Sequence, residues 1–212
     1  TKIKTDKEAL KKLLAEKQRS AKKIRSMIAE LVRKEVRQKQ KPVEKKTPAK
    51  TNLTSKSDKK TTPTVTPKSK VKDDDYVPPP KIIGSIGKII WPISSRKILR
   101  HYGENRNSET NTIFDNPGID IAASPGTGVV AAANGTVSLI NWLPGYGQLV
   151  IINHGNGFRS VYANLSSVSV RKGDEVRQGK SVGRTGHSVD GDFLHFELWT
   201  GTSRMNPASY LH

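Results

Sequence analysis

The stretch Asp192-Phe193-Leu194-His195-Phe196-Glu197-Leu198, near the C-terminus, alternates strictly between two kinds of side chain. In a β-strand, successive side chains point to opposite faces, so the three aliphatic and aromatic residues at 194, 196 and 198 share a core face. Phe193, His195 and Glu197 then share the other face. A histidine and a carboxylate beside a phenylalanine indicate either the floor of a site or an ordinary half-buried histidine. The segments that pack around this strand decide between the two.

Charge divides the 212 residues into a basic arm and a part that can form a core. The first 80 residues hold 24 of the 37 Lys and Arg and 10 of the 19 Asp and Glu, whereas every Trp and Phe lies beyond residue 90. A basic arm favours an acidic partner such as anionic lipid or an anionic wall polymer, or it is a solvated tail. Because no aromatic ladder is interleaved with its lysines, we expect no nucleic-acid partner.

The chain has no cysteine, which excludes a disulfide framework, a thiolate zinc site and a thiol nucleophile. No apolar run reaches the roughly 18 residues that a membrane-spanning helix needs. The sequence begins at Thr1 without a methionine or an apolar signal region, so we expect a processed or truncated piece of a longer protein.

Residues 6–40 are predicted to form one helix. Its apolar residues follow alternating steps of four and three, and two charged residues, Lys17 and Glu35, interrupt this seam. The seam consists of Leu10, Leu14, Ala21, Ile24, Ile28 and Leu31. The pattern favours the tail of a longer coiled coil in residues 1–40, and the alternative is a surface helix that docks on its own domain.

Residues 41–80 are rich in Lys, Thr, Ser and Pro and end in three prolines. They cannot bury enough apolar surface to offset their ordering entropy, so a disordered or extended basic linker is predicted. From residue 81 to the C-terminus, short β-rich runs begin with Ile82-Ile83-Gly84 and are punctuated by Gly and Asn. Asn134-Gly135 and Asn156-Gly157 are hairpin signals. An antiparallel β sandwich or barrel-like domain is therefore predicted for 81–212, with no helix after residue 100.

Four segments in this domain strongly resemble the lysostaphin-type zinc endopeptidases, or LytM domains, which cut peptide cross-links of bacterial peptidoglycan. They are Asn116-Pro117-Gly118-Ile119-Asp120, the glycine-hinged residues 145–157, Tyr162-Ala163-Asn164-Leu165 and residues 192–198. Residues 121–127, 131–137, 183–188 and 206–211 add to the likeness, which runs from about Trp91 to the end. The resemblance implies the duplicated-hybrid type of β fold.

The resemblance also implies which residues would catalyse. In active members, a His-x-x-x-Asp pair and the second His of His-x-His hold zinc, and here these positions are Asn116, Asp120 and His195. The two assisting histidines are replaced by Asn164 and Phe193. A catalytic zinc needs three protein ligands, and neither Asn nor Phe titrates, so we expect no catalytic residue, no retained zinc and no enzyme activity.

The flanking sequence sharpens the resemblance to the EnvC-like murein hydrolase activators, which pair a coiled coil with a degenerate LytM domain. Trp91-Pro92, residues 97–104 and residues 141–147 carry it. In that family the coiled coil is recruited by the FtsE–FtsX division complex, and the LytM domain relieves the autoinhibition of periplasmic N-acetylmuramoyl-L-alanine amidases. The resemblance implies a periplasmic activator in cell-wall remodelling and daughter-cell separation. A Lys- and Thr-rich linker stands where the family has more helical, regulatory sequence, which leaves self-inhibition open.

The former active-site groove is expected to bind the amidase, because exposed aromatic residues in a concavity can anchor a partner helix. Strand alternation places Tyr162 and Asn164 on the groove side, with Val161 and Ala163 inward. The alternative for the two tyrosines is packing that shapes the cleft. The expected lining residues are Asn116, Asp120, Tyr146, Leu149, Tyr162, Asn164, Phe193, His195 and Trp199.

Two other functions remain open at this point. In the first, the domain is a passive peptidoglycan-binding module whose arm holds anionic polymer. In the second, it is a residual zinc endopeptidase whose rearranged site recruits His187 or Asp192 from the loop before the last strand.

Overall fold

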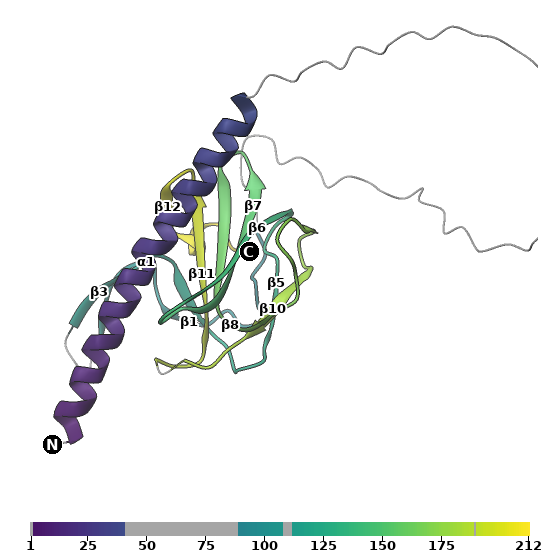
Figure 1. Cartoon of the computed structure of the whole chain (residues 1–212). Coiled ribbons are helices and arrows are strands. Elements are labelled where there is room, and N and C mark those ends of the chain that lie inside the picture. The colour runs from purple at the N-terminus through teal and green to yellow at the C-terminus, as the bar shows by residue number, and fades with distance from the viewer. Residues whose placement is uncertain (1, 41–88, 108–111, 189) are drawn as a thin grey trace, which may run out of the picture.

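A computed structural model of the chain describes residues 2–40, 89–107, 112–188 and 190–212, and the side chains at 2–11, 39, 40 and 107 lie outside the described part. One long helix lies along a β domain (Figure 1). The predicted linker at 41–80 and the β run at 82–84 lie outside the described residues, so these predictions, like the domain boundaries, stay predictions. No helix among the described residues is long and apolar enough to cross a membrane.

The helix α1 spans Lys2–Gln40. Twelve strands and one short 3₁₀ helix follow in the described part of the chain. They are β1 Ile98–Arg100, β2 Gly103–Asn107, β3 Thr112–Asn116, β4 Ile119–Ala122, β5 Gly128–Val130, β6 Gly135–Leu143, β7 Gly147–Gly155, β8 Phe158–Val168, β9 Glu175–Val176, β10 Ser181–Thr185, β11 Phe193–Thr200, β12 Ser203–Met205 and η1 Pro207–Ser209.

Ten strands form one antiparallel sheet, whose main path runs β1-β4-β11-β8-β7-β6-β9. β12 pairs with β11, while β10 pairs with both β8 and β5. The prediction of a mainly antiparallel β domain behind a helix is confirmed. The sheet is open, because the two ends of the path do not pair in the described structure, so the domain is not a closed barrel.

The two Asn-Gly signals have different outcomes. Asn156-Gly157 forms the β7–β8 hairpin turn, with φ values of 51° and 85° that suit Asn and Gly. The hairpin predicted at Asn134-Gly135 is wrong, because β5 and β6 do not pair with each other. Gly135 serves a close approach instead: a Cβ atom there would lie 2.4 Å from the carbonyl oxygen of Asn153.

Two apolar clusters lie on opposite faces of the central strands. The larger one contains the β11 residues Leu194, Phe196 and Leu198, all fully buried, as the alternation predicts. The smaller one lies between the sheet and α1. β11 therefore separates a conventional core from a face that α1 covers.

The coiled-coil interpretation of the α1 seam is wrong for the described residues, and the alternative, docking on the chain's own domain, is what the structure shows. Ile24 and Ile28 are both 0% exposed and pack against the sheet. Ala21, Met27, Leu31 and Val32 pack around them. A single amphipathic stripe needs one apolar surface to cover it, and here the sheet provides that surface.

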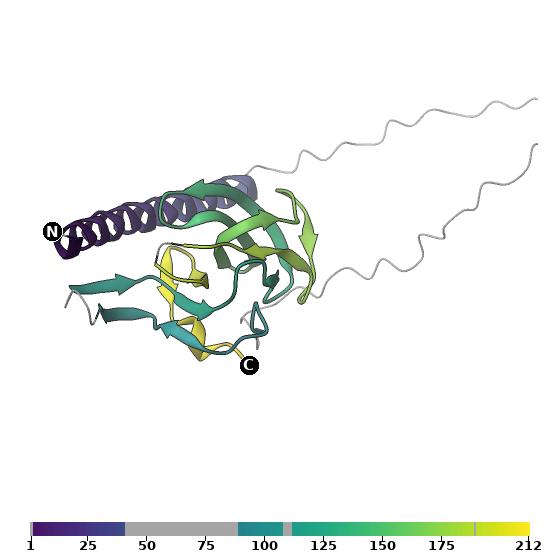
Figure 2. The ribbon, with the colours of Figure 1, turned by 90° about the horizontal axis from the view of Figure 1, so that it is seen from below.

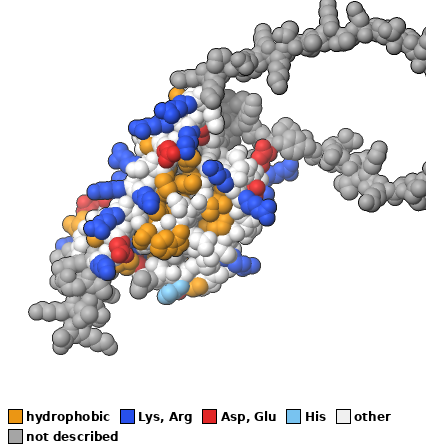
Figure 3. Space-filling view, in the orientation of Figure 1, with side chains coloured by type: hydrophobic (Ala, Val, Ile, Leu, Met, Phe, Trp, Pro, Cys, Tyr) orange, Lys and Arg blue, Asp and Glu red, His pale blue; other side chains and the backbone are white. Residues whose placement is uncertain are grey.

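The views of Figures 2 and 3 show what surrounds this layer. The β2–β3 ribbon projects from the sheet beside the N-terminal half of α1 (Figure 2). Lys and Arg side chains line the outer side of α1, and hydrophobic side chains gather next to it (Figure 3). The basic face of α1 is therefore exposed to solvent, while its apolar face packs against the sheet.

Candidate functional site

The register of three strands builds the site. β11 pairs with β4 so that His195 lies opposite Asp120, and on its other side it pairs with β8 so that His195 lies opposite Ala163. Gly118, which leads into β4, lets the two strands approach, because a Cβ atom there would lie 2.2 Å from the carbonyl oxygen of Phe196. The two remnant ligand positions are thus brought face to face from segments 75 residues apart.

His195 and Asp120 are bonded to each other. Nδ1 of His195 lies 2.6 Å from Oδ1 of Asp120, and Nε2 lies 3.0 Å from Oε1 of Glu197. The other oxygen of Glu197 accepts a hydrogen bond from the Trp199 indole at 2.6 Å. The other oxygen of Asp120 accepts one from Arg100 Nη1 at 2.7 Å. Every polar atom of these buried groups therefore has a partner.

The electrostatics of this cluster favour a charged imidazole. Burial by itself would lower the pKa of His195, but the charge of Asp120 and the hydrogen bonds that the ring donates to the Asp120 and Glu197 carboxylates raise it to about 9. Burial would raise the pKa of Asp120, yet His195, Lys17 and Arg100 outweigh this and lower it. At neutral pH the imidazolium of His195 thus balances the charge of the buried Asp120 carboxylate.

A metal ion fits poorly here, because the atoms that would bind it already have hydrogen-bond or ion-pair partners. Both ring nitrogens of His195 are engaged, and both oxygens of Asp120 are held. Asn116, at the third ligand position, turns its amide nitrogen toward the Arg100 carbonyl at 3.5 Å. Within the described residues, no group of three His, Cys, Asp or Glu side chains could hold a metal ion.

The alternative ligands weighed from the sequence pair with each other instead. His187 Nδ1 lies 2.7 Å from Asp192 Oδ1, and the two side chains are 75% and 43% exposed. Neither residue lines the cavity described below. The structure therefore does not bring them to the Asp120–His195 pair.

Asn164 occupies its position because β8 carries a bulge. Its φ of 63° lies in the left-handed region, which Asn tolerates better than most residues. Between the pairs Val150–Tyr162 and Gln148–Leu165, β8 has two intervening residues where β7 has one. The Asn164 amide nitrogen donates to the Phe193 carbonyl at 2.7 Å, which ties together the two positions at which the resemblance expects assisting histidines.

The bulge also explains why the expected location of Tyr162 is wrong. Tyr162 is fully buried in the larger cluster on the far face, and its hydroxyl accepts a hydrogen bond from the Ala132 amide at 2.9 Å. Val161 and Ala163, expected to point inward, lie in the cluster under α1. Strict alternation from Asn164 back to Tyr162 fails because the extra residue reverses the pleat.

Two cations lie close to the Phe193 ring. The Arg100 guanidinium carbon is 4.9 Å from the ring centroid and the Lys17 ammonium is 5.0 Å from it. Asp190 forms ion pairs with both cations, to Arg100 at 2.9 Å and to Lys17 at a shorter distance. A phenylalanine at this position therefore stabilises positive charge beside it instead of transferring a proton.

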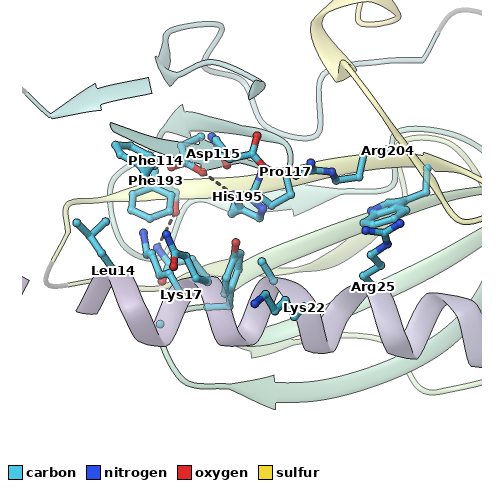
Figure 4. A pocket seen from close by; sticks show the side chains of 18 residues that line it. Leu14, Lys17, Lys22, Arg25, Phe114, Asp115, Pro117, Phe193, His195 and Arg204 are labelled. Atoms are coloured by element: carbon cyan, nitrogen blue, oxygen red, sulfur yellow. Dashed lines mark hydrogen bonds and ion pairs between the residues drawn. The ribbon is translucent and has the colours of Figure 1, made fainter. Parts of the chain in front are cut away.

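A cavity of about 290 Å³ remains between α1, β3 and the site. Figure 4 shows Phe193 and His195 directed toward α1, with Lys17 pointing from the helix to Phe193. Of the expected residues, those that line it are Asn116, Asp120, Tyr146, Asn164, Phe193, His195 and Trp199. We call the surface under α1, made by these residues and the apolar cluster beside them, the groove.

Three expected residues form the apolar part of the groove. Tyr146 is buried and stands edge-on to His195, with ring centroids 4.8 Å apart; burial and then the charges of Glu197 and Asp120 raise its pKa. Leu149 and Trp199 are buried beneath α1. Trp199 was expected at an open rim, but it is 1% exposed because the helix covers it.

Sequence reasoning missed several residues of this site. Arg100 and Asp190 were not singled out, nor was Arg159, which pairs with Glu35 of α1 at 2.5 Å. A signal was present, because Lys17 and Glu35 are the two charges that interrupt the apolar seam. They interrupt it where the helix meets charged groups of the β domain.

Comparisons with known proteins identify the relatives of this domain. Residues 115–207 match Peptidase family M23. The murein hydrolase activator EnvC of Escherichia coli (strain K12) is 35% identical over 127 residues, which are 59% of this chain and 29% of EnvC. The murein hydrolase activator NlpD of Salmonella dublin is 35% identical over 123 residues, which are 57% of this chain and 30% of NlpD. The chain thus spans less than a third of these relatives.

Solved structures share the fold. Csd3 of Helicobacter pylori superposes with a TM-score of 0.52 and 27% identity, over 59% of this chain and 35% of Csd3. A chain of the SpoIIQ–SpoIIIAH pore-forming complex also gives 0.52 and 27%, over 60% of this chain and 92% of that one. Residues 115–207 of the β domain therefore form a Peptidase family M23 (LytM) domain with homology to the murein hydrolase activators EnvC and NlpD.

Proposed function

We propose that this protein is a non-catalytic activator of peptidoglycan amidases in the bacterial cell envelope and that the groove binds the amidase. One observation carries the proposal: the two residues left at the zinc-ligand positions, Asp120 and His195, are closed onto each other by a buried ion pair. A site whose two candidate ligands are already paired with each other is poorly suited to hold a metal ion and well suited to form a rigid binding surface.

The chemistry of the neighbouring positions supports the absence of catalysis. Hydrolysis needs a group that can take up and return a proton at the reacting atoms. The Asn164 amide donates a hydrogen bond to the Phe193 carbonyl, and two cations lie close to the Phe193 ring. The imidazolium of His195, with both nitrogens engaged, is a poor general base at neutral pH.

A binding role is supported by the apolar part of the groove. It holds fully buried aliphatic side chains and Trp199, and a helix already lies on it. Binding of a partner through this surface therefore requires α1 to leave it. Related proteins point the same way, since EnvC and NlpD are named murein hydrolase activators and a similar fold occurs in the SpoIIQ–SpoIIIAH complex.

The periplasm is the compartment in which such an amidase would be met, and a Pseudomonas aeruginosa relative, 36% identical over 129 residues, is named a lipoprotein NlpD/LppB homolog. Recruitment by an FtsE–FtsX-type complex would act on α1, the segment that covers the groove. Peptidoglycan itself is a further expected partner of the protein.

The test mixes the full chain with an autoinhibited amidase and dye-labelled sacculi and compares wild type with Ile24→Asp/Ile28→Asp. Burying two carboxylates under α1 is unfavourable, so this variant should expose the groove. We expect the chain alone to release no dye, the mixture to release it, and the double variant to stimulate release more than wild type does.

Val36→Asp is the matched control, because Val36 is on the same helix but 47% exposed and should behave as wild type. Zinc is measured on the same preparation. Absence of stimulation by both wild type and the opened variant would refute the activator role. Stoichiometric zinc together with dye release by the chain alone would refute the absence of catalysis.

A further inference from the structure

The docked face of α1 carries opposite charges at its two ends. Lys17 and Glu35 are 18 residues apart, which is five turns of an α-helix, so both project from the same side, about 27 Å apart along the axis. Ile24 and Ile28 lie between them, and at 100° per residue each is within about 20° of the same line. The groove thus contacts one narrow stripe in the order cation, aliphatic, aliphatic, carboxylate.

The end of the groove that receives the cation is formed by the β domain alone. Asp190 pairs with the Lys17 ammonium, and the side chains are only 15% and 18% exposed. The Phe193 ring lies 5.0 Å from the same ammonium. Arg100 holds Asp190 from the domain side, through both its carboxylate and its carbonyl oxygen at 2.6 Å. An anion and a ring face, both pre-positioned, form a receptor for a primary ammonium or guanidinium group.

The other end receives a carboxylate. Asn153 donates to Oε1 of Glu35 at 2.8 Å, and Nη2 of Arg159 lies 2.5 Å from Oε2. Arg159 is 0% exposed, and its Nε and Nη2 atoms make no hydrogen bond of good geometry among the described residues, although Nη2 forms this ion pair. A fully buried guanidinium with unused donors needs an anion, so this end cannot stay empty without cost when α1 leaves.

Both charges lie on the stripe of α1 that faces the β domain. They interrupt the apolar seam of the helix, and the receptors on the β domain explain their positions.

We propose that the groove recognises its partner as an amphipathic helix carrying a Lys or Arg and, 18 residues toward the C-terminus, an Asp or Glu, with aliphatic residues 7 and 11 positions after the cation. This inference rests on the proposed function, since it specifies what the amidase or another partner must present. The cation-first order also sets the direction of that helix in the groove. A glycan strand offers no aliphatic stripe of this length, so the partner is a protein helix.

The test uses the full chain with Ile24→Asp/Ile28→Asp, which frees the groove, and a labelled peptide with the sequence of residues 12–38 as the probe. Fluorescence anisotropy gives the dissociation constant. We expect binding, and about tenfold weaker binding for each of the peptide changes Lys17→Glu and Glu35→Lys, as for lost charge-assisted hydrogen bonds. The Lys17→Glu peptide should regain affinity when the opened chain also carries Asp190→Lys.

Glu30→Lys in the peptide is the matched control. It makes the same charge change as Glu35→Lys, but Glu30 lies on the exposed face of α1, where it pairs with Lys34 of the same helix. Equal affinities of the Glu30→Lys and Glu35→Lys peptides, or no binding of the wild-type peptide, would overturn the inference.

A second measurement avoids the opened variant. In the intact chain, Lys17→Glu should increase exchange of the Trp199 indole proton, and adding Asp190→Lys should restore protection; failure of the swap to restore it would count against the inference. Peptide binding that follows the charges without amidase stimulation would refute the proposed function alone. Stimulation that is indifferent to these charges would refute the recognition rule alone.

Discussion

Removing the two buried isoleucines of α1 tests whether packing, and not covalent connection, holds the helix over the groove. Ile24 and Ile28 are both 0% exposed in the cluster beneath the helix. An Ile→Ala change at such a site costs about 2–5 kcal/mol. The two residues are neighbours on one helix face and share contacts, so their effects should not add fully. A combined loss of about 4 kcal/mol lowers the docked-to-undocked ratio about 10³-fold.

The expected consequence is local opening and not unfolding of the domain, because the larger cluster contains neither isoleucine. Most of the stability of a helix in a protein comes from packing of its amphipathic face, so released α1 should also lose helicity. The assay is hydrogen exchange of the Trp199 indole proton by NMR. That proton is donated to Glu197 at 2.6 Å, and the side chain is 1% exposed.

Ile24→Ala/Ile28→Ala should accelerate indole exchange strongly while the strand signals of β8 and β11 persist. Val36→Ala removes a comparable aliphatic group from the exposed side of α1 and should leave exchange unchanged. Trypsin provides an independent readout, because Lys and Arg within residues 12–38 become cleavable when the helix is released. Wild-type protection in the double variant by both readouts would refute the packing argument.

Three further outcomes follow from the structure. Replacing Asn164 by Gly should lower the free energy of unfolding less than replacing it by Ala. Both variants lose the hydrogen bond to Phe193, but only Ala is destabilised by about 1–2 kcal/mol at a φ of 63°. Equal urea unfolding midpoints for the two variants would contradict this. Phe193→Leu should weaken α1 docking by about 1 kcal/mol through loss of the ring beside Lys17 and Arg100, seen as faster tryptic cleavage of α1. Burial lowers the pKa of His154 from 6.5 to about 4, so the unfolded chain takes up a proton that the folded one resists. The free energy of unfolding should therefore be unaffected by this residue above pH 6.5 and fall by up to about 3 kcal/mol as pH drops toward 4. Urea unfolding of His154→Asn across this range should lack that part of the pH dependence, and an unchanged slope would show that another group is responsible.

Local patterns predicted well where the residues concerned meet their immediate neighbours. The alternation in residues 192–198 placed Leu194, Phe196 and Leu198 in the core, where the structure has them. Asn156-Gly157 predicted its turn because left-handed backbone is a property of those two residues. Asn134-Gly135 misled because the glycine is required by the approach of Asn153, a contact that no local pattern records.

The site was harder to predict, since it depends on pairings between distant segments. A single extra residue at Asn164 reversed the faces of Val161 and Tyr162, and a bulge leaves little trace in the sequence. The seam of α1 predicted one apolar partner surface but not which one. A period of three and four is the same whether the stripe meets a second helix or a sheet.

By itself, the sequence determined the class of the domain, the strand that carries His195 and the residues without a titratable group at positions 164 and 193, because each depends on residue type and short-range order. Only the tertiary structure decided that Asp120 and His195 neutralise each other, that two cations lie close to the Phe193 ring, and that α1 covers the groove with Lys17 and Glu35 at its ends. These features arise where segments far apart in the chain meet, and the free energy of such contacts is set by burial and by charge partners, neither of which a linear pattern specifies.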